Sequence, residues 1–437
     1  MSDILFAAVP IHGHVAPLLP LVRHFVDRGD RVRFLTGSRF ADAVLRAGAE
    51  HVPLPAAVDF DDRGVTAAFP ERAAMSPAKA IAFDFEHIFV RPGEHQHAAL
   101  RDLIDAGDVD AVVCDPLFVG AALLVESDPK QRVPVVVAGV VPLSYPGPGL
   151  APFGLGLAPL GGAVGRIRNG ILRMATQRMF RPVEAAADEI AVRALGAALS
   201  GPVLDWLPHA DAVCQLTVPR FEYPRPDAPA SLVFTGPVGA AAPAAAHPSW
   251  WGDLTGERPV VHVTQGTIAN DDPNELILPT IRALAGADVL VVVSTGGTPV
   301  EELGPLPSNV RAAEFLPYAD LFPKTDVFVT NGGYGGTQFA LAHGVPLVVA
   351  PGKEDKVEVA ARIAWSGTGV NLKTQRPTAR QIEKAVRMVL ADPRYRTAAR
   401  EIGADIRAAS HAVGFASVVD ASIAAHRAPR ATAPRPE

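Results

Sequence analysis

The sequence predicts an α/β protein with two doubly wound, Rossmann-like domains that face a central cleft. Three observations indicate this fold. The chain has 437 residues, which is too long for one ordinary hydrophobic core. Short apolar runs, typical of buried parallel strands, alternate with helical segments in both halves of the chain. A stretch rich in alanine and proline, 237–258, separates the two series and is the expected linker.

The first half of the chain carries three polar side chains at predicted strand ends. Its first strand is predicted at 4–10, and after a glycine turn an amphipathic helix is expected to begin near Pro17. The same rhythm continues with a helix at 39–47 and strands at 31–36, 51–54, 110–115 and 133–141. Ligands of doubly wound sheets bind at the carboxyl ends of the strands. We therefore expect His12, His14 and Asp115 at that crevice.

A long connection follows these strands. Residues 142–162 are rich in proline and glycine, and long loops of this kind often form lids or binding walls. A helical stretch comes next, and the spacing of its arginines favours a solvent-exposed face: Arg166, Arg168, Arg173, Arg178 and Arg181.

The second half repeats the strand and helix rhythm without visible sequence repetition. Its strands are predicted at 260–264, 289–294, 310–315, 327–330 and 347–350, and two of its helices at 381–390 and 395–409. We assign residues 1–236 to the first domain and 259–411 to the second. A C-terminal helix, 412–425, is expected to pack back on the first domain, and 426–437 to form a frayed tail.

The stretch 325–351 predicts an anion site. A buried strand ends at Asn331, four glycines follow within 332–336, and a helix is expected to start at Thr337. Such a turn brings backbone close to a ligand, and the helix start presents N–H groups and the positive end of a dipole, most plausibly to phosphate. The alternative is an ordinary glycine-rich turn between a strand and a helix, which would be favoured if the turn held only a lone glycine pair.

Composition narrows the functional classes. Hydrophobic residues make up 49% and charged residues 20%, which argues against general disorder. The net charge of −6 gives no reason to expect nucleic acid or an anionic membrane as a partner. No signal peptide and no apolar run of about 20 residues is visible, so a cytoplasmic protein is expected. Cys114 and Cys214 are too few for a disulfide framework.

Taken together, the histidine after the first strand and the glycine turn in the second half resemble the GT-B glycosyltransferases. The likeness is greater to the family that glycosylates small lipophilic acceptors from nucleotide sugars, including plant natural-product enzymes and bacterial macrolide glycosyltransferases. It covers nearly the whole chain. The family's Gly-His-x-x-Pro element is matched by residues 13–17. The resemblance implies that His14 is a general base and that Asp115 orients it, which also distinguishes His14 from the competing His12.

The resemblance further implies a site for the nucleotide-sugar donor. One turn would contact the diphosphate together with the glycine turn, an aromatic side chain would stack on the base, and an acidic pair would hold sugar hydroxyls. The donor-binding residues expected in this way are Gln265, Gly266, Thr267, Phe315, Leu316, Asn331, Gly332, Gly333, Gly335, Gly336, Thr337, Asp355 and Lys356.

Three positions of the donor site depart from the family pattern. Asn331 stands where the family usually has histidine, and Lys356 replaces an amide. Phe339 stands where a glutamate usually grips the ribose, so Gln338 or another residue would have to serve, or the contact is missing. On the acceptor side we expect His12, Phe85 and Phe118, within a pocket formed by the loops at 67–97 and 142–181.

The chemistry expected from these residues needs neither a metal nor a cofactor beyond the nucleotide sugar. A base must take the acceptor proton, and imidazole beside a carboxylate can do so near neutral pH. Helix N-termini can stabilise the leaving diphosphate in place of a metal ion. The clusters at 59–61 (Asp-Phe-Asp) and 95–97 (His-Gln-His) lack a convincing ligand context and are interpreted as solvated loops.

Two functions from different classes follow. The first is an inverting glycosyltransferase that moves a hexose, with glucose favoured, from UDP rather than TDP to a hydroxyl of a lipophilic natural product. The acceptor would be a macrolide, an ansamycin such as rifamycin, or a polyketide, and glycosylation would inactivate an antibiotic. The second is a non-catalytic relative that activates a partner or binds nucleotide sugars; a nucleotide-sugar epimerase fits less well. The presence of both His14 and Asp115 favours the enzyme, as a monomer or homodimer.

Overall fold

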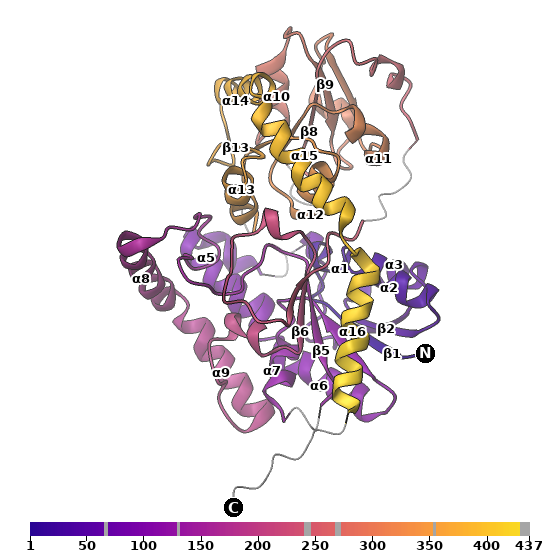
Figure 1. Ribbon diagram of the computed structural model, residues 1–437, viewed down its shortest axis with the longest axis vertical. Helices are drawn as coiled ribbons and strands as arrows, with labels where there is room; N and C mark the ends of the chain where they lie inside the picture. The colour runs from indigo at the N-terminus through magenta and orange to yellow at the C-terminus, as the bar shows by residue number, and fades with distance from the viewer. Residues whose placement is uncertain (65–68, 129–131, 240–245, 267–271, 353–354, 429–437) are drawn as a thin grey trace, which may run out of the picture.

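The computed structural model describes residues 1–64, 69–128, 132–239, 246–266, 272–352 and 355–428. Two α/β domains lie one above the other along the long axis of the molecule (Figure 1). Each contains one parallel sheet with helices on its faces, so the predicted fold of two doubly wound domains is confirmed. The last helix, α16 (His411–Arg427), returns from the second domain to the first, as the yellow ribbon shows (Figure 1).

The first domain is built on a seven-stranded sheet in the order β3-β2-β1-β4-β5-β6-β7. All of its neighbouring strands are parallel. Every residue of the central strands β1 and β4 is buried, as expected for strands covered on both faces. The strands are β1 (Asp3–Ala7), β2 (Arg31–Thr36), β3 (Glu50–Pro53), β4 (Ala111–Cys114), β5 (Val135–Gly139), β6 (Ala212–Gln215) and β7 (Leu232–Phe234).

The second domain has a six-stranded parallel sheet in the order β10-β9-β8-β11-β12-β13. Its strands are β8 (Val260–Thr264), β9 (Leu290–Ser294), β10 (Val310–Ala313), β11 (Val327–Thr330), β12 (Leu347–Val349) and β13 (Gly369–Asn371). The sequence analysis did not predict β13, because three residues with a glycine and an asparagine give no apolar run.

The helices of the first domain correct three sequence predictions. Residues 12–15 form the short helix α1 (His12–Val15) rather than a turn, and the amphipathic helix begins at Leu19 rather than near Pro17. The segment 95–97 lies inside α6, where Gln96 and His97 are buried, and is not a solvated loop. The longer helices are α2 (Leu19–Asp27), α3 (Ala41–Arg46), α5 (Pro77–Asp84), α6 (Gly93–Asp105), α7 (Val119–Glu126), α8 (Gly162–Met179) and α9 (Arg181–Leu195).

In the second domain, local sequence signals explain the best-predicted helices. Helix α14 begins with a capping box, in which Thr378 and Gln381 satisfy each other's backbone N–H groups. Helix α15 begins at a proline after Asp392, whose side chain accepts from the backbone of Arg394. The helices are α10 (Ile277–Leu284), α11 (Tyr318–Leu321), α12 (Tyr334–Ala342), α13 (Lys356–Trp365), α14 (Ala379–Ala391) and α15 (Pro393–Ala408).

Helix α16 covers the first domain with its apolar side. Phe415, Val419 and Ile423 belong to the same buried cluster as Phe6 and Phe25. At its surface the guanidinium of Arg28 pairs with the carboxylate of Asp420. In the described part of the chain no single helix is long and apolar enough to cross a membrane; α15 and α16 would qualify only together, and they meet at a bend of 51°.

Candidate functional site

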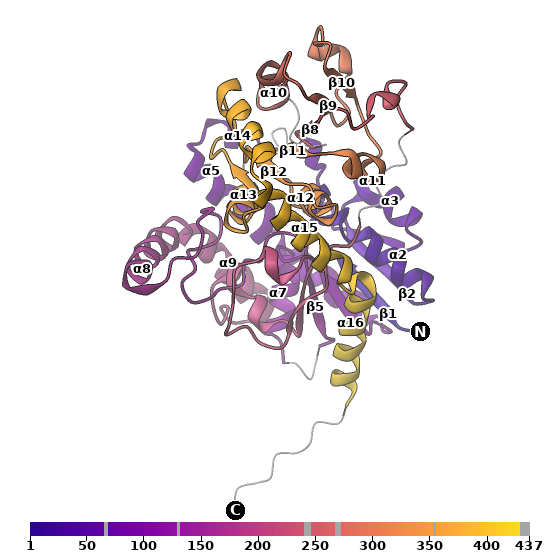
Figure 2. The same cartoon turned by 45° about the horizontal axis from the view of Figure 1, so that its top comes forward.

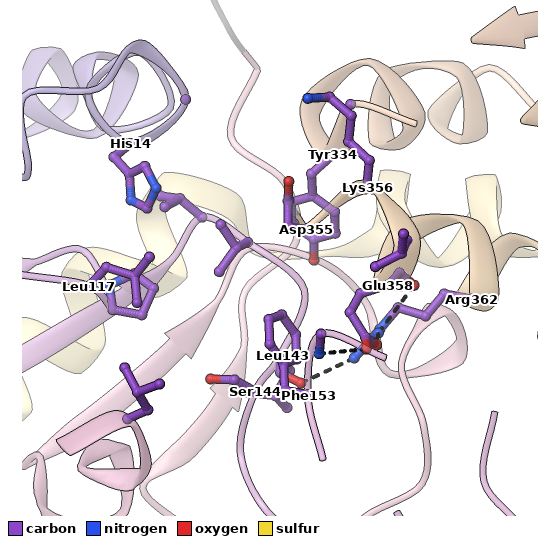
Figure 3. Close-up of a pocket in the computed structure, with 18 of the residues that line it drawn as sticks. His14, Leu117, Leu143, Ser144, Phe153, Tyr334, Asp355, Lys356, Glu358 and Arg362 are labelled. Atoms are coloured by element: carbon purple, nitrogen blue, oxygen red, sulfur yellow. Dashed lines mark hydrogen bonds and ion pairs between the residues drawn. The ribbon is translucent and has the colours of Figure 1, made fainter. Parts of the chain in front are cut away.

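A cavity of about 2040 Å³ lies between the two domains and is lined by both. On the first-domain side its wall includes helix α1 and the loop after β5, and on the second-domain side the N-termini of α12 and α13. In the close-up, His14 lies across this space from Tyr334, Asp355 and Lys356 (Figure 3). The carboxyl ends of both parallel sheets therefore contribute to one cavity, as doubly wound sheets do.

His14 and Asp115 are in direct contact. His14 Nδ1 lies 2.9 Å from Asp115 Oδ1, and both side chains are buried. The carboxylate is held by backbone N–H groups as well: Leu117 donates to Oδ1 and Val9 donates to Oδ2, each at 2.8 Å. A fixed carboxylate on Nδ1 places the imidazole proton there and leaves the lone pair of Nε2 as the acceptor. The arrangement can take a proton from a hydroxyl in the cavity.

His12 occupies the same short helix but a different environment. Its backbone N–H donates to Asp62 Oδ2 at 2.7 Å, and its side chain lines the cavity. Burial, and secondly the positive charge of Arg39, lowers the pKa of His12, so its ring is neutral near pH 7. Within the described residues, only His14 of this pair has a carboxylate against its ring.

The glycine turn forms a helix N-terminus, as the sequence predicts, but the helix begins earlier. Gly333 is the N-cap of α12, whose first residue is Tyr334 rather than Thr337. Gly333, Gly335 and Gly336 line the cavity, so backbone N–H groups of the first helical turn face it. A Cβ at Gly333 would have no atom within 4 Å, which leaves room for a ligand. Gly332 supports the turn instead: its φ is +92°, and the cavity wall does not include it.

Of the predicted phosphate contacts, Asn331 and Gln265 line the cavity and also contact each other, whereas Thr337 does not line it. The side-chain amide of Asn331 donates to the carbonyl of Gln265, and the side-chain oxygen of Gln265 accepts from two backbone N–H groups at the start of α10. Thr337 is fully buried and does not line the cavity, because the helix has already turned its side chain inward at this position. Gly266 lines the cavity with a φ of +83°. Thr267 lies outside the described residues.

The aromatic wall of the second domain also differs from the prediction. Phe315 and Leu316 are not in the cavity wall: Phe315 is half-exposed over Gly297, and Leu316 is buried in a separate core cluster. The ring wall is formed instead by Tyr318, Phe328 and Phe339, which line the cavity. The sequence analysis overlooked Tyr318 and Phe328, because neither follows a glycine turn or belongs to a polar pattern.

Asp355 and Lys356 lie at the start of α13 and line the cavity. One helical turn later, Glu358 and Arg362 form an ion pair with Nη1 and Oε2 2.8 Å apart. Glu358 Oε1 accepts from the backbone N–H groups of Gly154 at 2.8 Å and Gly156 at 2.9 Å (Figure 3 shows the surrounding side chains). The helix that carries the predicted sugar-binding pair thus also holds the loop at 142–162. Sequence reasoning missed this link, although Glu358 and Arg362 are oppositely charged residues four apart in a largely apolar helix.

The first-domain wall of the cavity is largely apolar. Phe85 lines it as predicted, whereas Phe118 is fully buried in the sheet core and does not reach it. Several carboxylates also line it, and burial raises the pKa of two of them, Glu184 and Asp205. Its apolar lining includes Ile81, Phe85, Ile88, Phe89, Leu150, Phe153, Leu155, Leu157, Met179 and Phe180.

No cluster of His, Cys, Asp or Glu in the described residues could hold a metal ion. The two clusters considered from sequence are accounted for without a metal ion. Asp61 pairs with Arg63, and this hydrogen-bonded pair lowers the pKa of Asp61 to about 2. Asp59 accepts from the backbone of Ser38, and His97 is buried in α6.

Comparisons with known proteins agree with this geometry. Residues 279–419 match the family described as erythromycin biosynthesis protein CIII-like, C-terminal domain. The chain is 43% identical to 4'-demethylrebeccamycin synthase of Lentzea aerocolonigenes, over 92% of this chain and 94% of that protein. It is 35% identical to UDP-glycosyltransferase 2 of Phaeomoniella chlamydospora, over 97% and 96%. It is 32% identical to UDP-glucosyltransferase B1 of Starmerella bombicola, over 91% and 92%.

Among solved structures, that of CalG4, the calicheamicin glycosyltransferase, is similar in fold. The TM-score is 0.74 and the identity 24%, and the match covers 98% of this chain and 100% of the other. The similarity in fold extends through both domains.

Proposed function

The chain belongs to the GT-B family of natural-product and UDP-glycosyltransferases, and from this we propose that it transfers a hexose, with glucose favoured, from UDP to a hydroxyl group of a lipophilic natural product. The observation that supports this most is one of placement. His14, with the fully buried Asp115 behind its ring, and the N-terminus of α12 line the same cavity from opposite domains. A base and an anion site are the two elements that such a transfer requires.

The proposed reaction is a single displacement. The acceptor hydroxyl gives its proton to Nε2 of His14 while its oxygen attacks the anomeric carbon, and the bond from that carbon to the diphosphate oxygen breaks. The anomeric configuration is therefore inverted. Asp115 stabilises the imidazolium that forms, because its carboxylate lies on Nδ1 and backbone N–H groups fix its position.

The diphosphate would leave against the N-terminus of α12, near Gly333, Gly335 and Gly336. The start of α13 would place Asp355 at the sugar hydroxyls, with Lys356 beside it. UDP is preferred to TDP because two of the relatives are UDP-glycosyltransferase 2 and UDP-glucosyltransferase B1. The large apolar chamber, with Phe85 and Phe153 in its wall, fits a lipophilic acceptor such as a macrolide, an ansamycin of the rifamycin type or a polyketide.

The test is transfer to a panel of acceptors. The protein is incubated with UDP-glucose or TDP-glucose and a set of hydroxylated macrolides, ansamycins and phenolic polyketides, and product masses are read. We expect a product heavier by one hexose, an equal amount of UDP, and an inverted anomeric centre by NMR. Binding of UDP-glucose with no product from any acceptor would favour the alternative, a non-catalytic nucleotide-sugar binder.

A further inference from the structure

Helix α8 (Gly162–Met179) has an apolar face without a partner in the described residues. Val164, Ile167, Ile171 and Met174 are between 57% and 71% exposed. Their spacing of three, four and three residues places them on one side of the helix. Both views show α8 at the outer edge of the molecule, away from the two sheets (Figures 1 and 2). Four large apolar side chains in one exposed row are unusual on a protein surface and mark an interaction site.

The same helix is strongly basic. It contains four arginines and no acidic residue, whereas the whole chain has a net charge of −6. Arg166 and Arg178 are exposed, as is Arg181 at the start of α9, and none of the three pairs with a carboxylate in the described part of the chain. The overall negative charge therefore hides a local positive region, which explains why the charge balance of the sequence gave no reason to expect an anionic surface.

An apolar row beside unpaired arginines is the pattern of a helix that lies in the interface of a membrane. We propose that α8 docks on an anionic lipid surface, with Ile167, Ile171 and Met174 among the acyl chains and the arginines against the headgroups. Charge complementarity selects this partner over a second copy of the chain. Two copies meeting symmetrically through α8 would place arginines against arginines, with no acidic residue of α8 to compensate.

Exposed apolar side chains also line the cavity. Ile81, Leu155 and Leu157 are each more than one-third exposed and also line the cavity wall. Ile81 lies on α5, which contacts α8. A lipophilic acceptor dissolved in the bilayer would thus meet apolar side chains from the membrane to the chamber. This consequence rests on the proposed function, whereas membrane binding itself does not.

Flotation with lipid vesicles tests the proposal. The full chain is mixed with vesicles of phosphatidylcholine alone or with one-third phosphatidylglycerol, at low and at high salt. We expect binding to the anionic vesicles that weakens with salt, because exposed charges are screened. Two exposed double variants, Ile167→Asp with Met174→Asp and Arg166→Glu with Arg178→Glu, should each lower the partition coefficient by about tenfold or more.

The matched control is Val413→Asp, which changes an equally exposed valine on α16 and should bind as wild type does. Transfer to a water-soluble acceptor should be unchanged in all variants, so that loss of the proposed enzyme activity and loss of membrane binding remain separate results. Equal binding of wild type and the α8 variants to anionic vesicles, or no binding of wild type, would overturn the proposal. The wild-type protein could instead self-associate in the analytical ultracentrifuge while the α8 variants do not. That result would overturn the proposal and show that α8 forms a dimer interface.

Discussion

Nε of Arg362, on α13 of the second domain, lies 2.8 Å from Oε2 of Glu222 in the first domain, and both side chains are only 1% exposed. Arg362 also pairs with Glu358 and donates to the carbonyl of Leu143, while Glu222 Oε1 accepts from the backbone N–H of Leu143. Burial alone would lower the pKa of Arg362, but the two carboxylates raise it above its ordinary value. A buried, fully paired guanidinium therefore joins the domains beside the cavity.

Removing this guanidinium should be strongly destabilising. Arg362→Ala leaves the buried Glu358 without its cation and leaves Glu222 only the more distant Arg225, 3.7 Å away, and breaking a buried pair in this way costs about 3–5 kcal/mol. We expect a clearly lower midpoint of urea denaturation. The control is Arg220→Ala, which removes another pair between the domains, with Asp405, at an exposed site. It should leave the midpoint close to that of wild type, since exposed pairs contribute little. Equal midpoints for both variants would mean that the buried network does not hold the domains together.

The predictions from sequence succeeded where local chemistry decides the structure. The apolar runs around Phe6 and Val329 became fully buried strands, because such runs fit the interior of a parallel sheet. The placement of His14 and Asp115 at one sheet edge was expected because both follow strands whose carboxyl ends meet there. Their direct contact was expected from the family resemblance and not from the pattern of the sequence.

The predictions failed where packing between distant segments decides. Nothing near Phe118 in the sequence reveals that its ring faces the sheet core, and nothing near Thr337 reveals that α12 starts three residues earlier. The link from Glu358 to Gly154 joins residues about 200 positions apart and depends on how the two domains meet. Likewise, the exposed row of α8 becomes visible only in the structure, where none of the described elements covers it.

Stability should fall in mildly acidic solution because of His262, which was not singled out from sequence. This residue of β8 is fully buried against Phe328, and its Nδ1–H donates to the carbonyl of Val292. Burial lowers its pKa from 6.5 to about 4. Between these values the unfolded chain binds the proton and the folded chain does not, so the contribution is fully present above pH 6.5 and is lost as the pH falls towards 4.

Linkage gives the size of this effect. The free energy of unfolding should fall by about 1.4 kcal/mol per pH unit, or by about 3 kcal/mol across the interval. His262→Phe keeps a ring beside Phe328 but has no group to titrate. Urea denaturation from pH 4.5 to 7 should therefore show a shallower dependence of unfolding free energy on pH for the variant. Parallel curves for the two proteins would contradict the buried, neutral histidine.

Transfer should survive excess EDTA. In the proposed mechanism the diphosphate is held by the N-terminus of α12, and no group of metal-binding side chains is present among the described residues. The rate with UDP-glucose and an acceptor should be the same before and after dialysis against the chelator. A loss of activity that added magnesium restores would show that a cation neutralises the diphosphate.

His14→Ala should reduce the transfer rate by about 100-fold or more while UDP binding, measured by calorimetry, stays near that of wild type. The reason is that the imidazole acts on the acceptor proton and not on the donor. The transfer rate of Asp115→Asn should lie between those of wild type and His14→Ala. This substitution keeps a polar group beside His14 but removes the charge that stabilises the imidazolium. The control is His12→Ala in the same short helix, and its transfer rate should fall far less. A larger loss for His12→Ala than for His14→Ala would move the base to His12.

The donor site can be divided into a phosphate part and a sugar part by two substitutions. Gly333 has a φ of −58° and open space around its Cβ position, so Gly333→Val should fold without strain and place its methyl groups where the phosphate would approach. We expect weaker binding of UDP by calorimetry. Gly252→Val is the control, because Gly252 also has open space but lies outside the cavity wall. UDP affinity that is unchanged in Gly333→Val would remove the diphosphate from the start of α12.

Asp355→Ala should weaken the binding of UDP-glucose without weakening the binding of UDP itself. Asp355 lines the cavity at the start of α13, and in the proposed complex its carboxylate accepts hydrogen bonds from sugar hydroxyls rather than contacting phosphate. UDP itself should therefore bind as tightly as to wild type, since a negative charge contributes nothing favourable to a diphosphate. UDP-glucose should bind more weakly, by about 1.5–3 kcal/mol, the usual contribution of a hydrogen bond to a charged group. Calorimetry with both ligands measures the difference directly. Equal losses for UDP and UDP-glucose would show that Asp355 supports the fold of the turn and that the sugar lies elsewhere in the cavity.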